Sequence, residues 1–194
     1  MSILGYINTL KRIREGKTNY RKRKALLIGR HTFATVRISN ENLQVQITKP
    51  KKDGDQVIVS AHSRELIKYG WKGSRNSLPA SYLTGYLIGL KALSKGIESC
   101  ILYLGNRSFS SRVAAVVKGM LDAGLSIPID EDAIPSMDRI EGKHIAEYAS
   151  LLKVDEEAYK RRFSRLLSLG LKPEDYPAHF NEVKNIITER MKGV

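Results

Sequence analysis

The hydrophobic pattern of this chain changes its period after Ala61, and this change limits the fold more than any other feature. Before it, three short runs rich in β-branched residues are separated by turn residues, at Thr32–Ser39, Leu43–Lys49 and Val57–Ala61. Apolar and polar side chains alternate in the second run, as in a strand with one buried face. Runs joined this closely predict an antiparallel meander of three strands.

After the meander, the apolar residues recur at helical spacing, interrupted by one short apolar run. Helices are predicted at Arg64–Tyr69, with Ser63 as N-cap, at Ala80–Ser94 and at Ser111–Ala123, and a strand at Ile101–Leu104. Strand–helix units that follow a meander predict an α/β domain of two or three layers around a mixed sheet.

Two glycines, Gly85 and Gly89, lie four residues apart in the second predicted helix. In a helix of a globular domain, this spacing of small residues favours close packing, here expected against the sheet. The chain continues with a polar, proline-containing connector at 126–137. Three further helices are predicted beyond it, at Arg139–Leu152, Glu156–Leu169 and Pro177–Lys192.

Positive charge is concentrated in the first part of the chain. The 33 Lys and Arg residues outnumber the 20 Asp and Glu residues, giving a net charge of +13 that predicts an anionic partner. Residues 1–30 hold nine basic residues and one acid, whereas residues 126–194 hold eleven and thirteen. We therefore predict a basic RNA-binding arm at 1–30, an α/β core at 31–125 and a connector with a helical extension at 126–194.

The arm is predicted to be an open chain. Eight of the fourteen residues at 11–24 are Lys or Arg, and almost none of the others can be buried. Mutual repulsion of these charges should keep the segment extended until an anion neutralises them.

The residue pattern does not favour an enzyme. Gly16-Lys17-Thr18 lacks the upstream glycine and buried strand of a phosphate-binding loop. The four histidines are too far apart for a zinc site, and the predicted strands contain no Asp or Glu to hold catalytic metal ions. His62, Ser60 and Ser63 are interpreted together as a surface or capping cluster and not as a nucleophile with its base. No catalytic residue, metal or cofactor is expected.

Membrane and secretory readings are also disfavoured. The longest apolar stretch, Tyr82–Leu93, is too short to span a bilayer, and the start of the chain does not resemble a signal peptide. The single cysteine, Cys100, lies in an apolar run and is interpreted as a buried thiol in a reducing cytosol. We expect a cytoplasmic protein with no membrane partner and no homo-oligomer.

Basic residues are interleaved with aromatic ones in two places. Tyr20 lies within the basic arm, and Trp71 lies in the glycine-containing segment 68–76, KYGWKGSRN. A planar ring stacks on an unpaired base while nearby Lys and Arg hold phosphates. Two interpretations of Trp71 stay open, a base-stacking ring and a ring that covers the edge of the core.

Five longer segments occur in an order that is recognisable. They are REGKTNYRKR at 14–23, VSAHSRELIKYGWKG at 59–73, LPASYLTG at 78–85, SRVAAVVKGMLDAGLSIP at 111–128 and IEGKHIAEYA at 140–149. In this order they resemble the archaeal form of the 5S rRNA-binding protein of the large ribosomal subunit, the universal L-eighteen family. The eukaryotic counterpart of this family is called L-five.

The resemblance implies a ribonuclease-H-like central fold without the nuclease carboxylates, and no enzymatic activity. It implies a structural protein that binds 5S rRNA, attaches it to large-subunit rRNA in the central protuberance, and neighbours ribosomal proteins such as the universal L-five family. The alternative is a metal-dependent nuclease of the same fold. The 105–111 loop is shorter and poorer in lysine than is usual in relatives, so Arg107 is not carried over as an RNA contact and the role of the loop stays open. The RNA-binding residues expected from pattern and resemblance together are Lys11, Arg12, Arg14, Lys17, Tyr20, Arg21, Lys22, Arg23, Lys24, Arg30, Lys68, Trp71, Lys72, Arg75 and Arg112.

Overall fold

The structure is a computed structural model, and it describes residues 10–51 and 53–192. The first nine residues of the predicted arm and the last two of the predicted extension lie outside the described residues. The elements of the arm and the central region are α1 (Lys11–Arg14), α2 (Tyr20–Ile28), β1 (Phe33–Ile38), β2 (Leu43–Lys49), β3 (Gln56–His62), the 3-10 helix η1 (Ser63–Tyr69), α3 (Leu78–Leu93), β4 (Ile101–Leu102) and α4 (Ser111–Asp122).

The four strands form one mixed sheet in the order β3-β2-β1-β4. The first three strands pair antiparallel, and β4 pairs parallel with β1. This confirms the predicted meander and the mixed α/β class, and the strand order is consistent with a ribonuclease-H-like sheet. The predicted fourth strand is shorter than expected, because only Ile101 and Leu102 pair with β1.

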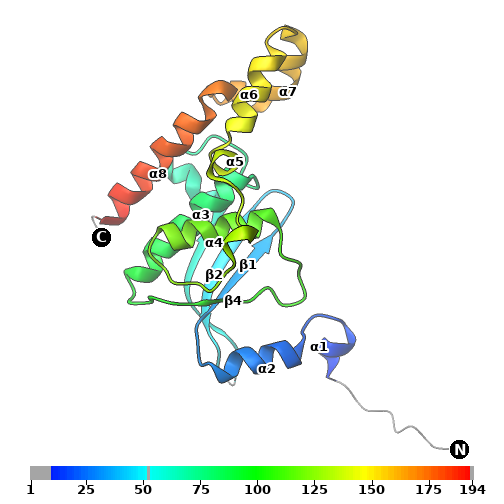
Figure 1. Ribbon diagram of the computed structural model, residues 1–194, viewed down its shortest axis with the longest axis vertical. Coiled ribbons are helices and arrows are strands. Elements are labelled where there is room, and N and C mark those ends of the chain that lie inside the picture. The colour runs from blue at the N-terminus through cyan, green and yellow to red at the C-terminus, as the bar shows by residue number, and fades with distance from the viewer. Residues whose placement is uncertain (1–9, 52, 193–194) are drawn as a thin grey trace, which may run out of the picture.

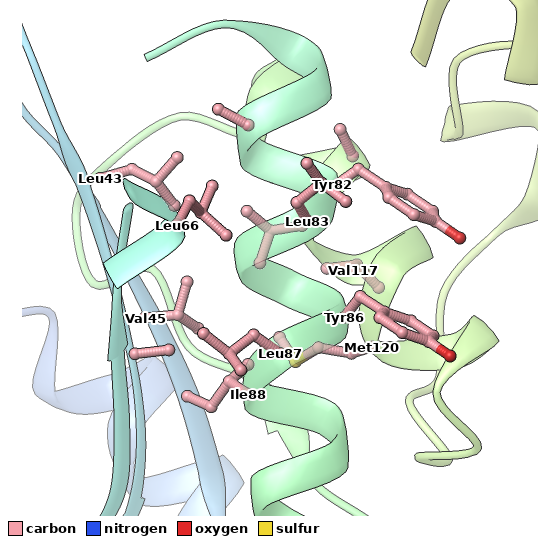
Figure 2. Close-up of a cluster of buried hydrophobic side chains, with 14 of the residues drawn as sticks. Leu43, Val45, Leu66, Tyr82, Leu83, Tyr86, Leu87, Ile88, Val117 and Met120 are labelled. Atoms are coloured by element: carbon pink, nitrogen blue, oxygen red, sulfur yellow. The ribbon is translucent and has the colours of Figure 1, made fainter. Parts of the chain in front are cut away.

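The core lies between the sheet and two helices in successive layers. Leu43 and Val45 of β2 point toward Leu83 and Leu87 of α3, and α4 packs on the opposite side of α3 (Figure 2). Because α3 lies between two layers, twelve of its sixteen residues are buried. Its nearly continuous apolar composition follows from this position and not from a membrane, since no helix of the described chain is long and apolar enough to cross one.

The two glycines of α3 pack against α4, so the prediction that they contact the sheet is wrong. A Cβ atom built at Gly85 would lie 2.1 Å from the carbonyl oxygen of Val116, and one at Gly89 would lie 2.5 Å from the Cβ of Ala123. Gly119 of α4 makes the reciprocal approach, with its Cβ position 2.2 Å from the carbonyl oxygen of Tyr82. These glycines let the two helix backbones approach closely.

The segment after β3 begins one residue earlier than predicted and is a 3-10 helix. His62, and not Ser63, is its N-cap: the His62 ring accepts a hydrogen bond from the Arg64 amide, and the Glu65 carboxylate accepts one from the His62 amide. The interpretation of His62 as part of a capping cluster is therefore confirmed.

The C-terminal elements are η2 (Glu131–Ala133), α5 (Met137–Glu141), α6 (Lys143–Leu152), α7 (Glu156–Ser168), η3 (Pro173–Asp175) and α8 (Tyr176–Lys192). The single helix predicted at Arg139–Leu152 is two helices, because Gly142 adopts a left-handed conformation with φ of 87°. The α6–α7 hairpin projects away from the sheet, at the end opposite to the arm (Figure 1).

The last helix returns to the central region and shares its core. Phe180, Val183 and Ile187 of α8 belong to the same buried cluster as α3 and the sheet. A polar chain reinforces this contact, since Lys184 donates to the Tyr82 hydroxyl at 2.8 Å and Tyr82 donates to Asp122 at 2.6 Å. Burial and the hydrogen bond to Asp122 raise the pKa of Tyr82, so its hydroxyl stays protonated and remains a donor.

Candidate nucleic-acid interface

The arm contains a helix, so the prediction of an open arm is wrong for the described residues. The helix α2 begins at an Asn19 N-cap that accepts a hydrogen bond from the Lys22 amide. Its Arg, Lys, Ala and Leu residues are good helix formers, and a side-chain cap supplies one of the first missing bonds. None of its residues is buried. Local propensity and a few side-chain contacts therefore hold this helix, and not a core.

Arg23 supplies the main described contact between α2 and the sheet. Its guanidinium forms two hydrogen bonds with the Asp55 carboxylate, and its Cζ lies 5.6 Å from the ring centroid of Tyr103 and 6.0 Å from that of Phe33. The hydrogen bond to Asp55 raises the pKa of Arg23 above its ordinary value, so this cation is permanent. α2 is therefore fixed across the lower end of the sheet (Figure 1).

Between α2 and the sheet lies a groove of about 1350 Å³, here named the arm groove. One wall comes from α2 and the preceding loop, and the other comes from β1, residues 50–51 and 54–55, and the segment after β4. The charged and aromatic residues that line it are Arg12, Lys17, Tyr20, Arg23, Lys24, Arg37, Lys51, Asp55, Tyr103 and Arg107.

A second groove of about 710 Å³, here named the loop groove, continues from the first. Both are lined by Val36, Leu104, Asn106 and Arg107, which shows that they are adjoining parts of one depression. The loop groove ends at the start of α4, where Arg112 donates a hydrogen bond of 2.7 Å to the Asn76 side chain.

The lining of the two grooves is strongly cationic. Eight Lys or Arg side chains face a single acid, Asp55, which already neutralises Arg23. A concave surface with one sign of charge concentrates an oppositely charged ligand, and walls of this kind favour phosphates. The side-chain amides of Asn40, Asn76 and Asn106 and the rings of Tyr20 and Tyr103 lie among the cations. The two grooves therefore offer contacts for sugars and bases as well.

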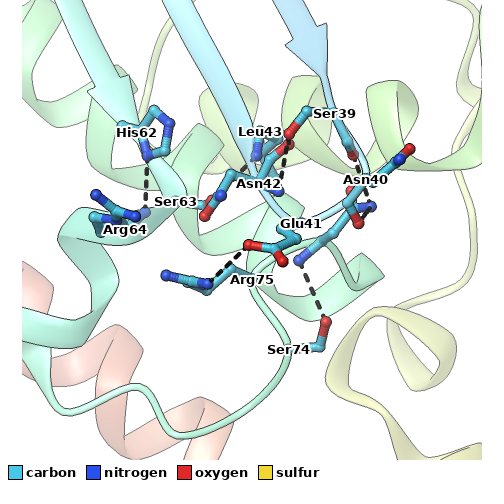
Figure 3. A network of polar contacts seen from close by, with 11 residues as sticks. Ser39, Asn40, Glu41, Asn42, Leu43, His62, Ser63, Arg64, Ser74 and Arg75 are labelled. Atoms are coloured by element: carbon cyan, nitrogen blue, oxygen red, sulfur yellow. Dashed lines mark hydrogen bonds and ion pairs between the residues drawn. The ribbon is translucent and has the colours of Figure 1, made fainter.

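The β1–β2 turn, whose Ser39 and Asn40 also line the loop groove, is held by side chains from the segment before α3. The Asn76 amide donates to the carbonyl oxygens of Ser39 and Asn40, each at 2.9 Å. Arg75 forms an ion pair with Glu41 at 3.6 Å in the same network (Figure 3). Asn76 therefore links the turn to Arg112, and so fixes the position of that cation at the end of the groove.

The structure brings some of the predicted RNA-binding residues together and separates others. Six of them line the grooves: Arg12, Lys17, Tyr20, Arg23, Lys24 and Arg112. Five more are exposed on the arm outside the groove lining: Lys11, Arg14, Arg21, Lys22 and Arg30. Lys68 and Lys72 are exposed near α8, away from the grooves, and Arg75 is paired with Glu41.

Trp71 does not offer a ring to a base. Only 3% of its surface is exposed, and it packs edge-on against Tyr176 and stacks on His179, with ring centroids 5.5 and 5.3 Å away. Its indole nitrogen donates to the Ser74 carbonyl oxygen at 3.3 Å. The prediction of base stacking is therefore wrong, and the other interpretation, a ring that covers the edge of the core, is confirmed. Burial of this site follows from α8, which the local sequence does not reveal.

Four cationic or aromatic groove residues were missed from the sequence: Arg37, Lys51, Tyr103 and Arg107. Arg37 lies on the polar side of an alternating strand, a signal that could have been used. Arg107 lies in the short loop whose role the sequence left open, and it lines both grooves. Lys51 and Tyr103 carry no local signal, because strand pairing alone brings them beside the arm.

The described residues contain no group of three or more His, Cys, Asp or Glu side chains that could hold a metal ion. The sheet topology and the two adjoining grooves define a class of protein: a mixed α/β protein with a continuous cationic groove suited to a polyanion. Residues 6–103 match the family described as ribosomal large subunit proteins 60S L5 and 50S L18. The chain belongs to this family.

Curated relatives cover almost the whole chain. The large ribosomal subunit protein uL18 of Thermofilum pendens is 50% identical over 186 residues, which is 94% of this chain and 95% of the relative. Those of Aeropyrum pernix and Saccharolobus solfataricus are each 49% identical and cover 95% and 91% of this chain and 88% and 90% of their own lengths. Membership of this family confirms the expected class, an archaeal-type protein of the large ribosomal subunit that is not an enzyme. The alternative of a metal-dependent nuclease is therefore set aside. The expected location on the cytoplasmic ribosome follows from the same membership.

Proposed function

We propose that this chain binds 5S ribosomal RNA through the arm groove and the loop groove. The observation that carries the proposal is the groove lining, where seven Lys and Arg side chains lie beside the Arg23–Asp55 ion pair and no second acid is present among the lining residues. Family membership supports a ribosomal RNA as the polyanion. In this proposal the cations hold phosphates and position the RNA, while the polar side chains between them contact sugars and bases.

The test is a titration of the full chain with a 5S rRNA transcript at several salt concentrations. Each phosphate contact contributes a slope of about 0.7 to 0.9 in a plot of log affinity against log salt. Replacement of Arg37 or Arg107 by Ala should weaken binding and lower that slope by about one unit. The matched control is Arg161→Ala, which removes an exposed arginine on α7, far from the grooves, and should leave affinity and slope unchanged. Equal affinity for 5S rRNA and for an unrelated structured RNA of the same length would overturn the proposal.

The proposal extends to assembly. On the resemblance of its sequence, the chain attaches 5S rRNA to large-subunit rRNA in the central protuberance, beside a protein of the universal L-five family. Sedimentation of the chain with 5S rRNA, with and without large-subunit rRNA, tests the attachment. Chemical cross-linking within assembled subunits tests the protein neighbour.

The division into a basic arm at 1–30, a core at 31–125 and an extension at 126–194 stays a prediction. Removal of residues 1–24 tests the first boundary, because none of the described residues of this segment belongs to the main hydrophobic cluster. The shortened chain should unfold cooperatively, lose no more helical circular dichroism than α1 and α2 supply, and bind 5S rRNA more weakly. Loss of cooperative unfolding would show that the arm is part of the folded core.

A further inference from the structure

The side of the sheet that faces away from α3 is polar, and most of its side chains are not among the groove cations. Alternate residues of β1, β2 and β3 point away from α3, and the strand register places them in two cross-strand rows. One row is Arg37, Gln44 and His62, and the other is Thr35, Gln46 and Ser60. All six side chains are partly or fully exposed, whereas their sequence neighbours on these strands are largely buried against the helices. These six residues are named the open face.

The open face continues the floor of the arm groove. Thr35 and Arg37, which belong to its two rows on β1, also line that groove. From there the face extends over β2, the strand between β1 and β3, where Gln44 and Gln46 occupy its centre. A ligand that lies in the arm groove therefore reaches the open face without a break in the surface.

The chemistry of the open face fits RNA in a specific way. None of its six members is an acid, although the chain contains 20 Asp and Glu residues. Its central residues, Gln44 and Gln46, carry uncharged side-chain amides. No hydrogen bond joins either side-chain amide to another described side chain or backbone group. Amides of this kind both donate and accept, as do the 2′-hydroxyls and base edges of RNA, whereas phosphate oxygens only accept.

The shape of the face decides which form of RNA it takes. Neighbouring strands are about 4.8 Å apart, so the rows form a shallow and nearly flat lattice of hydrogen-bonding groups. The six residues include no Phe, Tyr or Trp, and the single imidazole, His62, is held at the edge of the face as the cap of η1 by the Arg64 amide. Unpaired bases are held mainly by stacking on aromatic rings, and the centre of the open face has none. A paired RNA helix instead exposes a wide, shallow minor groove with 2′-hydroxyls and base edges along it.

We propose that the open face binds the minor groove of a double-helical segment of the RNA, with the Gln44 and Gln46 amides as the residues that distinguish RNA from other polyanions. This inference rests on the proposed RNA-binding function and adds the form of RNA that is recognised. The cations of the arm groove supply most of the affinity and its salt dependence. The two amides supply contacts that depend on the ribose hydroxyl.

The first experiment removes both amides and measures binding of the full chain to a 5S rRNA transcript. Gln44→Ala with Gln46→Ala should lower the affinity about ten-fold and leave the salt slope unchanged, because neither side chain is charged. The matched control, Asn181→Ala with Asn185→Ala, removes two exposed amides four residues apart on α8. It should bind within two-fold of the parent chain. Unchanged binding by the open-face variant, in a parent that binds 5S rRNA, would overturn this inference and leave the proposed function intact.

The second experiment uses a helical segment of 5S rRNA as an RNA duplex and the same sequence as a DNA duplex. The parent chain should prefer the RNA duplex, and the double glutamine variant should lose most of that preference because the 2′-hydroxyl contacts are gone. Equal preference in parent and variant, or competition by single-stranded RNA as strong as by the duplex, would overturn the inference. Gln46→Glu provides an isosteric variant for the same assay, and its carboxylate should weaken RNA binding further by repelling the phosphates. Thermal unfolding of every variant shows that the sheet remains folded.

Discussion

The Arg23 guanidinium of α2 donates two hydrogen bonds to the Asp55 carboxylate, which lies just before β3 and 32 positions later in the sequence. Because none of the α2 residues is buried, this ion pair and the stacking of Arg23 on Tyr103 set the position of the arm helix. One wall of the arm groove therefore depends on a polar contact and not on hydrophobic packing.

Exchange of the two charges tests this contact. Arg23→Asp or Asp55→Arg alone should loosen α2 and speed hydrogen exchange of its amides, whereas the double variant, which restores an ion pair, should recover part of the protection. A double-mutant cycle should give a coupling of about 1 kcal/mol, typical of a partly exposed pair. The control is exchange in α4, which should not change. Additive effects of the two substitutions would show that the pair does not hold the arm.

Because glycines lie where α3 and α4 meet, an added methyl group at these positions should lower the free energy of unfolding. Gly85→Ala and Gly119→Ala should each destabilise the protein by about 1–3 kcal/mol, because the added methyl group meets a backbone carbonyl that cannot move alone. Thermal or denaturant unfolding measures this cost. The comparison is Ser164→Ala on the exposed side of α7, where the same side chain should have little effect. A neutral Gly85→Ala variant would contradict the close approach of the two helices.

Two aromatic residues predict opposite results in the same pair of assays. Trp71→Leu should lower thermal stability, because a large buried ring and its hydrogen bond to Ser74 are lost, yet leave the RNA affinity of the folded protein unchanged. Tyr20→Leu should leave stability unchanged, because the ring is exposed, and weaken RNA binding about five-fold or more if it stacks on a base. The reverse pattern would restore Trp71 to the RNA-binding residues.

His179 predicts a pH dependence of stability. Its Nε2 accepts a hydrogen bond of 3.1 Å from the Lys72 amide, and burial lowers the pKa of the ring below its ordinary value despite the nearby Glu182. The unfolded chain therefore binds a proton more readily than the folded one. The stabilisation is fully present above the unfolded pKa, near 6.5, and is lost as the pH falls through the lower folded value.

Thermal unfolding between pH 7.5 and 5.5 measures this effect. The parent chain should lose stability on acidification more steeply than His179→Gln, which keeps a polar side chain but cannot take up a proton in this range. Titration of the carboxylates occurs in both proteins, so the difference between the two curves isolates His179. Parallel curves would show that the ring stays protonated or unprotonated equally in the folded and unfolded states.

Strand pairing explains why the sequence predicted only part of the site. The arm cations are consecutive in sequence, so their charge density reveals them without any structure. Arg37 and Arg107 are 70 positions apart and reach one groove because β4 pairs with β1. The aromatic residue that looked most suited to a base, Trp71, is covered by a helix that begins about a hundred residues later.

Local patterns by themselves determined the elements and the polarity of this protein. Alternation of side chains defines the strands and their open face, helical spacing defines α3 and α4, and charge composition identifies a polyanion as the partner. The tertiary structure alone decided which cations share a groove, which glycines meet across helices and which rings are buried. These outcomes depend on contacts between residues far apart in sequence, where the free energy of packing and of ion pairing outweighs the preference of any single segment.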